Sequence, residues 1–461
     1  MRFLLPTLVR FALPFGVLVT LPASAQAPRL DYERFQLPNG LDVVLHRDPS
    51  TPFVSVNTWY HVGSGAEQPG RTGFAHLFEH LMFEGSGHVP EGAIDAWLEE
   101  VGGGANGSTT VDRTNYTIDA AANALELALY LDADRMAHLL DAMSPATVEG
   151  QRGVVMNERR QRYENAPYGL AFPVLGQYLY SEDHPYHHPV IGSMADLGAA
   201  SHEDVVQFFR SYYTPNNASL VVAGDFDPAE ARRLVERWYG SIPRGPDPPA
   251  RASAPARLSA EQRLLLEDRV ELPRLYLAWH GPARYAPGDA AATALASVLA
   301  SGKNSRLYRR LVYEDQIAQD VSAFQDGSTL GGEFYVIATA RPGHSLAEIE
   351  RAIQEEIDRL KAEPPTAREL ERVQNGIEAA FLDGLESIGA KADQLNGYLT
   401  FVGTPDFFEE DLARYRALSP RDLQDAAMTW LRDDARVVLS IVPEGQADHA
   451  APGSTPAQNN Y

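Results

Sequence analysis

Ser201-His-Glu-Asp-Val-Val-Gln-Phe-Phe-Arg-Ser-Tyr212 leads into the apolar run Leu220-Val-Val-Ala223, and the same pattern returns near the end of the chain. There, Ser419-Pro-Arg-Asp-Leu-Gln-Asp-Ala-Ala-Met-Thr-Trp430 precedes Val437-Val-Leu-Ser440. A displacement of 218 residues (419 − 201) superposes the two segments without a gap. Each copy predicts a Ser-capped helix followed by a β-strand. Because one copy ends each half of the chain, we interpret the pattern as a duplicated fold.

The stretch between the two copies has the composition of a linker. Residues 243–258 include Pro243–Pro255, which is rich in Pro, Ala and Arg and offers almost nothing to bury. We therefore expect two homologous domains, an N-terminal one at 26–242 and a C-terminal one at 259–443. Residues 444–461 are poor in apolar side chains and are expected to form a disordered tail.

Elsewhere the sequence mixes strand and helix patterns. Leu41–His46 and Phe53–Tyr60 predict neighbouring strands of a hairpin. Helical spacing occurs in four segments, which are 73–83, 91–101, 121–142 and 145–163. Strands and helices in blocks, without strict alternation, favour an α+β fold of two similar halves, each a mostly antiparallel sheet with helices packed on it.

The first 25 residues have the three regions of a signal peptide. Arg2 and Arg10 precede the apolar run Phe11–Leu21, and Ala23-Ser-Ala25 supplies small residues at a cleavage site. The run is too short to be a membrane anchor. The chain has no Cys, so it offers no thiol for lipid attachment and no disulfide. We expect an exported protein, in a bacterial periplasm, with no membrane anchor.

The chain is strongly acidic. Its formal net charge is −23, and loss of Arg2 and Arg10 with the signal peptide makes it −25 (−23 − 2). Such a surface repels nucleic acid and anionic lipid, which disfavours both as partners. It is compatible with cationic peptides, although most of these charges are expected to serve solubility.

The segment Gly73-Phe-Ala-His-Leu-Phe-Glu-His-Leu-Met-Phe83 carries three ionisable side chains among apolar ones. On a helix, His76 and His80 stack on one face and Glu79 lies beside them. A helix that is apolar nearly all round is buried, and a divalent metal would compensate all three polar groups. We interpret the segment as the site of one Zn²⁺ per chain. The alternative is a pair of core histidines bonded to a neighbouring acid.

A third metal ligand must come from another segment. Glu158 shares a helical face with Val154 and Val155, so it is expected to point toward the core, whereas Glu149 is expected to face solvent. Glu158 is therefore the predicted third ligand of an inverted zinc motif. The remaining histidines form no comparable cluster in the sequence, and His184 and its neighbours are expected in a surface turn.

With these residues, the chain resembles the pitrilysin/insulinase family of zinc peptidases along nearly the whole mature sequence. His76, His80 and Glu158 match that family's zinc ligands, and Glu79 matches its catalytic glutamate. Three further blocks resemble family signatures, namely Gly102–Tyr116, His184–Gly192 and Tyr213–Asp225. A chain of two halves is similar to the processing-peptidase and bacterial two-subunit branch. Because the motif lies in the first half, we expect 26–242 to be the catalytic zinc domain and 259–443 to be a homologous, non-catalytic domain.

The resemblance implies hydrolysis of peptide bonds in short or unfolded peptides. Zinc lowers the pKa of its bound water, and Glu79 acts as the general base that takes the water proton and passes it to the leaving amine. The segment around Ala105 and Asn106 is expected to pair with an extended substrate through backbone hydrogen bonds. On the sequence alone, a flexible Gly-rich loop is an equal reading of that segment.

The chain departs from the family at two places. Members commonly carry an acid seven residues before the third ligand, to support the metal site, and this chain has Gln151 there. Self-sufficient members also carry an Arg and a Tyr in the second half, to stabilise the oxyanion. Alignment of Arg309–Gln319 places Val312 and Gln319 at those positions, and a valine has no donor.

We therefore expect a heterodimer with a homologous subunit that supplies the Arg/Tyr pair; a homodimer is the other arrangement that the sequence allows. The neighbours Arg310 and Tyr313 are out of register, although a local shift in the alignment would restore one of them. The alternative function is a non-catalytic assembly or scaffold subunit of a peptidase-like complex. A structural zinc site is disfavoured because such sites prefer four protein ligands, often Cys.

Overall fold

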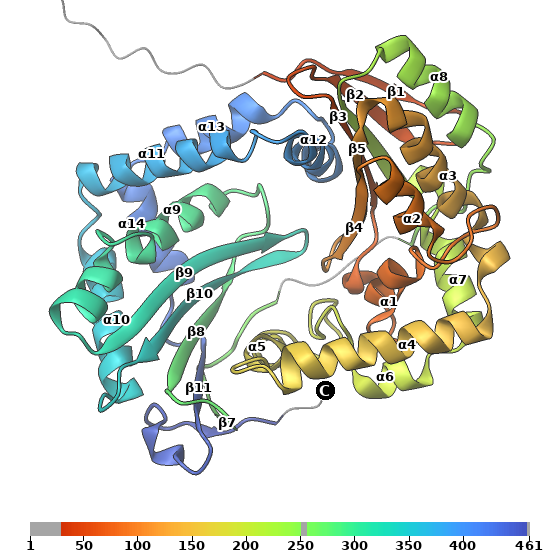
Figure 1. Ribbon diagram of the computed structural model, residues 1–461. Helices are drawn as coiled ribbons and strands as arrows, with labels where there is room; N and C mark the ends of the chain where they lie inside the picture. Colours follow the sequence, from red (N-terminus) through yellow and green to blue (C-terminus); the bar gives the residue numbers. More distant parts are fainter. Residues whose placement is uncertain (1–28, 250–255, 459–461) are drawn as a thin grey trace, which may run out of the picture.

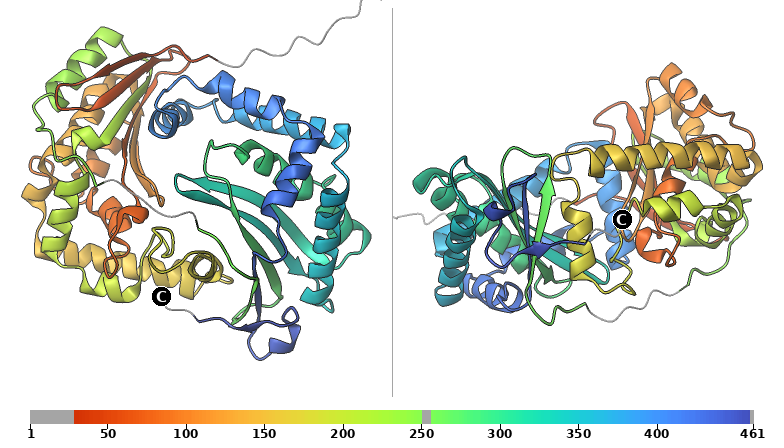
Figure 2. Two further views of the ribbon diagram at one scale, coloured as in Figure 1. Left: turned by 180° about the vertical axis from the view of Figure 1, so that it is seen from behind. Right: turned by 90° about the horizontal axis from the view of Figure 1, so that it is seen from below.

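The computed structural model describes residues 29–249 and 256–458, and it contains two six-stranded sheets with helices around them (Figures 1 and 2). The first sheet has the order β1 (Glu33–Gln36), β2 (Asp42–Arg47), β6 (Ala218–Gly224), β3 (Phe53–Tyr60), β5 (Thr114–Ala121) and β4 (Gly104–Thr109). The second has the order β12 (Thr455–Pro456), β7 (Gln262–Asp268), β11 (Val437–Pro443), β8 (Arg274–Gly281), β10 (Gly331–Ala340) and β9 (Ala318–Ser328). Most strand pairs are antiparallel, which confirms the α+β prediction.

The helices of the first half are α1 (Phe74–Leu81), α2 (Ala93–Glu100), α3 (Leu125–Ala142), α4 (Pro145–Arg159), α5 (Ala171–Leu179), α6 (Met194–Ala199), α7 (His202–Tyr212) and α8 (Pro228–Tyr239). Those of the second half are α9 (Asp289–Ala300), α10 (Leu346–Ala362), α11 (Ala367–Asp383), α12 (Ile388–Val402), α13 (Phe408–Arg416) and α14 (Pro420–Trp430). The four predicted helical segments correspond to α1, α2, α3 and α4. A π-helical turn, Arg160–Glu164, continues α4.

The repeat seen in the sequence is a repeat in the structure. α7 and α14 each begin with a capping box, in which Ser201 pairs with Asp204 and Ser419 with Asp422. The strands that follow, β6 and β11, are buried along their whole length near the middle of their sheets. Two helix-to-strand units of the same sequence pattern thus occupy the same position in the two sheets.

The expectation that Leu41–His46 and Phe53–Tyr60 form a hairpin is wrong. Both segments are strands, but β6 lies between them, parallel to β2 and antiparallel to β3. β6 is an apolar run that is buried on both faces, and this favours a central position over the edge of a sheet. The order of strands in space therefore does not follow the order in the chain.

The expected disordered tail is also wrong for residues 444–458. β12 pairs in parallel with β7 and fills the sheet position that β1 fills in the first half. The segment before it is anchored by Ala451, which is buried and donates its backbone N–H to Ser440 Oγ at 3.0 Å. Backbone pairing thus orders a stretch with few apolar side chains. The predicted signal peptide and residues 459–461 lie outside the described residues.

The two halves exchange helices across their boundary. α12 of the second half packs on β3 and β6 of the first sheet, whereas α5 of the first half packs on β8 and β11 of the second (Figure 1). Each exchanged helix has an apolar core of its own, around Tyr398 for α12 and around Leu175 for α5. The boundary predicted from the sequence, between 242 and 259, therefore separates the strands of the two sheets. It does not separate the helices, because α5 and α12 each pack on the sheet of the other half.

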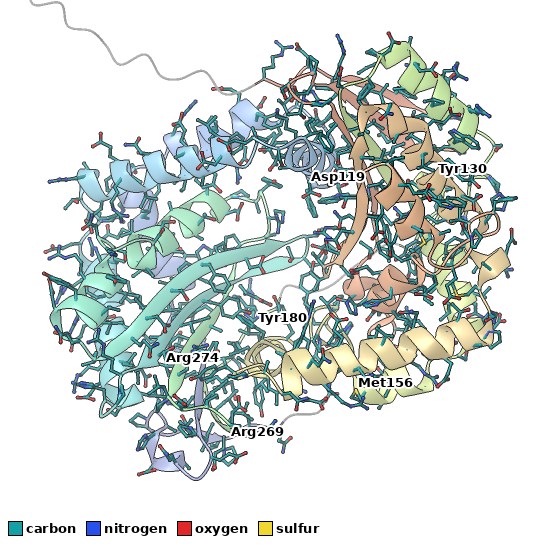
Figure 3. All side chains as sticks on the ribbon, in the orientation of Figure 1. Asp119, Tyr130, Met156, Tyr180, Arg269 and Arg274 are labelled. Atoms are coloured by element: carbon teal, nitrogen blue, oxygen red, sulfur yellow. The ribbon has the colours of Figure 1, made fainter. Side chains whose placement is uncertain are left out.

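A carboxylate on α12 fastens this exchange. Asp393 Oδ1 accepts hydrogen bonds from Asn57 Nδ2 at 3.2 Å, Trp59 Nε1 at 3.1 Å and Asn115 Nδ2 at 3.2 Å, all of them on strands of the first sheet. Beside it lies a cavity of about 430 Å³ that both halves line, with Arg113 and Tyr180 from the first half and Arg284 from the second. Tyr180 points inward between the halves, whereas Tyr130 lies on the outer helical layer (Figure 3).

No helix within 29–249 or 256–458 has the length and apolar character needed to cross a membrane.

Candidate active site

Helix α1 carries the inverted motif, and a buried carboxylate holds its first turn. The helix starts after Gly73, which has a φ of 91° and provides no side-chain cap. Glu67, which lies upstream, accepts hydrogen bonds from the backbone N–H groups of Gly73 at 2.8 Å and Ala75 at 2.7 Å. A carboxylate at a helix N-terminus satisfies free donors there. Glu67 was not predicted, because it precedes the helix by more than one turn.

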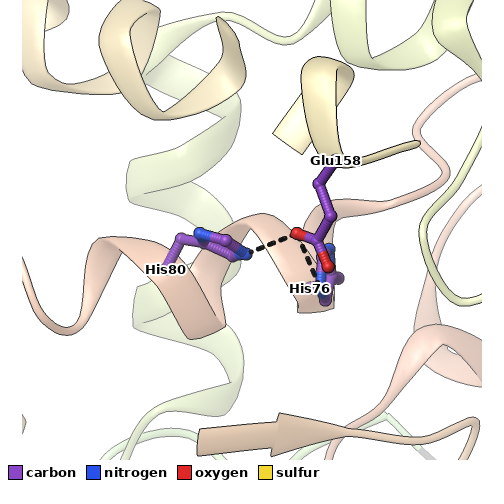
Figure 4. Close-up of side chains that lie close together, drawn as sticks. All are labelled: His76, His80 and Glu158. Carbon is purple, nitrogen blue, oxygen red and sulfur yellow. Dashed lines mark ion pairs between the residues drawn. The ribbon is translucent and has the colours of Figure 1, made fainter. Parts of the chain in front are cut away.

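His76 and His80 point from α1 toward one carboxylate oxygen (Figure 4). Glu158 Oε2 lies 3.1 Å from His80 Nε2 and 3.8 Å from His76 Nε2. The three side chains each offer a ligand atom within 4.8 Å of the others. Burial lowers the pKa of His76 to about 4, which keeps that imidazole in the neutral form that a metal requires. Two imidazoles and a carboxylate that converge in this way fit zinc and leave room for a further ligand.

Glu158 reaches this point from α4, close to the end of the helix. Val155, one turn before it, is fully buried and packs α4 onto the core, whereas Val154 is 47% exposed. The face argument is therefore correct for Glu158 and Val155 and wrong for Val154. Glu149 is exposed and pairs with Arg152, as expected. On the outer side, Arg162 Nη1 lies 3.0 Å from Glu158 Oε1 and holds the second oxygen of that carboxylate.

Glu79 lies on the side of α1 that faces the edge strand β4. Thr109 Oγ1, at the end of β4, donates to Glu79 Oε2 at 2.5 Å. Burial raises the pKa of Glu79, and the hydrogen bond from Thr109 partly opposes that rise. Strand and helix are in close contact here, since a Cβ added to Gly107 would lie 2.9 Å from Glu79 Cγ and 3.2 Å from the Phe83 ring. Glycine at 107 is therefore what lets β4 approach α1.

The segment around Ala105 and Asn106 is a strand and not a flexible loop. It forms β4, which pairs with β5 on one side and is the edge of the first sheet on the other. Ala105 packs against the core of the first half, and Asn106 is exposed. An edge strand beside Glu79 offers unpaired backbone groups to an extended peptide.

Gln151 contacts an acid near the site that the sequence did not identify. Its Nε2 donates to Glu84 Oε1 at 2.5 Å. Glu84 follows α1 by three residues, and burial raises the pKa of its carboxyl. An acidic side chain thus lies near the ligands despite the glutamine at 151. Glu84 and Thr109 could be recognised only after α1, α4 and β4 had been placed in space.

The two out-of-register neighbours, Arg310 and Tyr313, do not form the expected Arg/Tyr pair. Val312 lies in the π-helical turn Tyr308–Glu314, and Gln319 lies at the start of β9. Arg310 is engaged elsewhere, in ion pairs with Glu355 and Glu356 on α10. Tyr313 is 75% exposed. Neither neighbour compensates for the departure from the family pattern.

His184 and its neighbours lie in a turn, as expected, but the expected surface position is wrong for His184. His184 is buried and stacks on Tyr180, with ring centroids 4.4 Å apart. His188 Nδ1 lies 3.6 Å from Glu67 Oε2, under the start of α1. A separate group, His88, Asp134 and His138, converges at the surface. These contacts join segments that are distant in the chain, so spacing alone did not reveal them.

Comparison with known proteins agrees with the geometry. Residues 42–186 match the family described as Insulinase (Peptidase family M16), and residues 199–377 match the Peptidase M16 inactive domain. Zinc protease PqqE of Helicobacter pylori is 30% identical over 441 residues, which cover 93% of this chain and 97% of that protein. This chain belongs to the M16 family of zinc proteases. The inactive-domain match begins at the end of the first half and covers most of the second, whereas His76, His80 and Glu158 lie within the Insulinase match.

Solved structures give the same result for the fold of this M16 protein. The crystal structure of a protease from Helicobacter pylori superposes with a TM-score of 0.85 at 26% identity, over 90% of this chain and 100% of that one. The periplasmic protease PqqL from Escherichia coli has a TM-score of 0.77 at 18% identity and shares the fold over 92% of this chain and 49% of its own.

Proposed function

We propose that this chain is the catalytic subunit of a zinc-dependent endopeptidase that hydrolyses short or unfolded peptides. The observation that carries the proposal is the convergence of His76, His80 and Glu158 beside the half-buried carboxylate of Glu79. Membership of a family of zinc proteases supports it. His76, His80 and Glu158 would hold the metal. When bound, the metal would lower the pKa of its water ligand and polarise the scissile carbonyl.

Glu79 is proposed as the general base. Its carboxylate removes a proton from the attacking water and then returns it to the nitrogen of the leaving amine. Burial raises the pKa of Glu79, which brings it nearer to the pH at which a carboxylate both accepts and releases a proton. Thr109 Oγ1 fixes one carboxylate oxygen and leaves the other for the reaction.

The edge strand β4 is proposed as the substrate strand. An extended peptide that pairs with Ala105 and Asn106 would place its scissile bond beside Glu79, since Thr109 of the same strand contacts that residue. Backbone pairing gives affinity without demanding a side-chain sequence. We further propose that the protein is exported to the periplasm, on the evidence of its first 25 residues.

The proposed partner is a homologous subunit that supplies the Arg/Tyr pair, with a second copy of this chain as the other arrangement. The proposal rests on two replacements, because Val312 and Gln319 stand at the positions where self-sufficient family members carry the Arg and the Tyr. The second candidate function, a non-catalytic assembly subunit, is favoured by the same two residues. It is disfavoured by the retention of all four residues of the zinc motif.

The test is cleavage of a short unfolded reporter peptide by the purified mature chain, with Glu79→Gln as the blank. The glutamine keeps the shape and cannot accept the proton, so we expect cleavage to fall by about 10²-fold or more while zinc content is unchanged. Zinc-loaded chain without activity points to the partner, to be tested by rescue with a homologue that carries the pair. A chain that neither binds zinc nor cleaves contradicts the proposal.

A further inference from the structure

A second group of metal-ligating side chains lies outside the proposed active site, between α3 and the loop that follows α1. Asp134 and His138 are four residues apart on α3 and therefore share a face of that helix. His88 comes from the loop. Each of the three offers a ligand atom within 4.8 Å of the others.

The protein holds this loop in place by contacts of its own. Ser86 Oγ donates to Asp134 Oδ2 at 2.5 Å, and the backbone N–H of His88 donates to the same oxygen at 3.1 Å. The backbone N–H of Gly87 donates to the carbonyl of His138 at 2.9 Å. A metal that bound here would thus find His88 already positioned, and little ordering entropy would oppose binding.

The donors have the chemistry of a transition-metal site. His88 Nδ1 lies 2.7 Å from Asp134 Oδ1, and the His88 and His138 rings are 4.7 Å apart. His138 Nδ1 lies 3.0 Å from Asp141 Oδ2. A ligating histidine whose other ring nitrogen donates to a carboxylate is held in orientation by that carboxylate. Imidazole suits zinc, copper and nickel, whereas magnesium and calcium prefer oxygen ligands only.

Burial and charge also favour a cation at this place. The Asp134 side chain is 5% exposed, while those of His88 and His138 are 61% and 42% exposed. The carboxylate thus forms the floor of the group and the two imidazoles form its open rim. With Asp141, two carboxylates face two histidines in an acidic protein. An ion would remain accessible to solvent, and water would complete its coordination.

We propose that His88, Asp134 and His138 form a second, solvent-accessible site for a transition-metal cation such as Zn²⁺, with Asp141 orienting His138. The proposal does not depend on the peptidase activity. An ion there would fasten the loop that follows α1 to α3. It would stabilise the folded chain by mass action, in proportion to the free metal concentration.

The experiment distinguishes the two sites in the full mature chain. A chelator first removes all metal, and the binding of added Zn²⁺ is then measured by calorimetry. The double variant His76→Ala/His80→Ala removes the first site, and we expect it to bind one equivalent of zinc with a micromolar Kd. Addition of His138→Ala should abolish that binding, because His138 is a proposed ligand. His344→Ala, which removes a histidine of the second half, is the matched control and should retain it.

Thermal unfolding gives an independent measurement. On excess Zn²⁺, the His76→Ala/His80→Ala variant should gain several degrees in Tm, and the same chain with His138→Ala should gain none. If the double variant does not fold, the wild-type chain should bind two equivalents and His138→Ala alone one. Zinc binding that His138→Ala leaves unchanged, in the double variant or in the wild-type chain, overturns the proposal.

Discussion

The two halves of this chain share the order of most of their elements and differ in their chemistry, although β1 opens the first half and its counterpart β12 closes the second. By order, α1 corresponds to α9 and α4 to α11. α1 contacts the edge strand β4 and helix α4, and α9 likewise contacts the edge strand β9 and helix α11. α1 carries two histidines and a glutamate, whereas α9 after Asp289 contains no ionisable residue and is mostly buried alanine and leucine. The fold therefore does not require the metal site. A few side chains on one copy of a shared backbone create it.

The comparison also suggests what the second half contributes. It lends α12 to the inner face of the first sheet, and the residues of α12 bond to β3 and β5 near the edge strand. In return it accepts α5 on its own sheet. The second half thus stabilises the sheet that presents β4, although it lacks the zinc motif.

The largest expected effect breaks the comparison at the proposed third ligand. Glu158→Gln replaces a carboxylate that lies 3.1 Å from His80 Nε2 with a neutral amide, a much weaker zinc ligand. We expect loss of bound zinc and a fall in peptide cleavage of about 10³-fold. Glu378→Gln is the matched control, because it removes a carboxylate from α11, the corresponding helix. Retention of zinc by Glu158→Gln would show that another acid completes the site.

A gain of function tests the same contrast from the other side. Val312→Arg with Gln319→Tyr gives the second half the pair that it lacks, and we expect cleavage by the chain alone to rise. One oxyanion donor is typically worth about 10²-fold, so a rise of about 10-fold would already be informative. Val312→Arg with Gln319→Phe is the control, since it adds the ring without the hydroxyl. Unchanged solo activity would count against a partner that supplies these groups.

A smaller loss is expected where β4 meets α1. An alanine at 107 would place its Cβ 2.9 Å from Glu79 Cγ, so Gly107→Ala must displace Glu79 or the strand. We expect cleavage to fall by about 10-fold or more, because misplacement of a catalytic group by about 1 Å costs up to 10²-fold. Gly104→Ala lies on the same strand, where an added Cβ meets nothing within 4 Å, and should leave the rate unchanged. Equal cleavage rates for the two variants would show that the close approach of β4 does not determine the position of Glu79.

Local patterns predicted the elements better than the contacts between them. The helices, the capping boxes at Ser201 and Ser419, and the metal-binding motif all depend on spacing within one segment, and such signals are readable from sequence. The hairpin failed because the partner of β2 is β6, which lies far along the chain. The tail failed because backbone pairing, and not side-chain burial, orders β12. Glu67 and Glu84 were not predicted, because their hydrogen-bond partners become apparent only when the helices are placed relative to one another.

The smallest expected effect concerns the exchange of helices. Lys391 on α12 forms an ion pair with Asp48, next to β2, and its hydrogen bond lowers the pKa of Asp48 to about 2. A carboxyl whose pKa is lower in the folded state stabilises the fold above its unfolded value of 3.8, and that contribution disappears as the pH falls toward 2.

Asp48→Asn should therefore lower the free energy of unfolding at pH 6, and we expect about 1 kcal/mol because solvent screens a pair so near the surface. Urea unfolding at pH 6, 4 and 3 measures the difference, which should shrink at the two lower values. Lys391→Met should lose the same amount at pH 6, and the double variant should lose no more than either single one. Additive losses would mean that the two side chains act separately. The ion pair would then not be what ties α12 to the first sheet at this point, and the hydrogen bonds of Asp393 and Asn396 would be left to hold that helix.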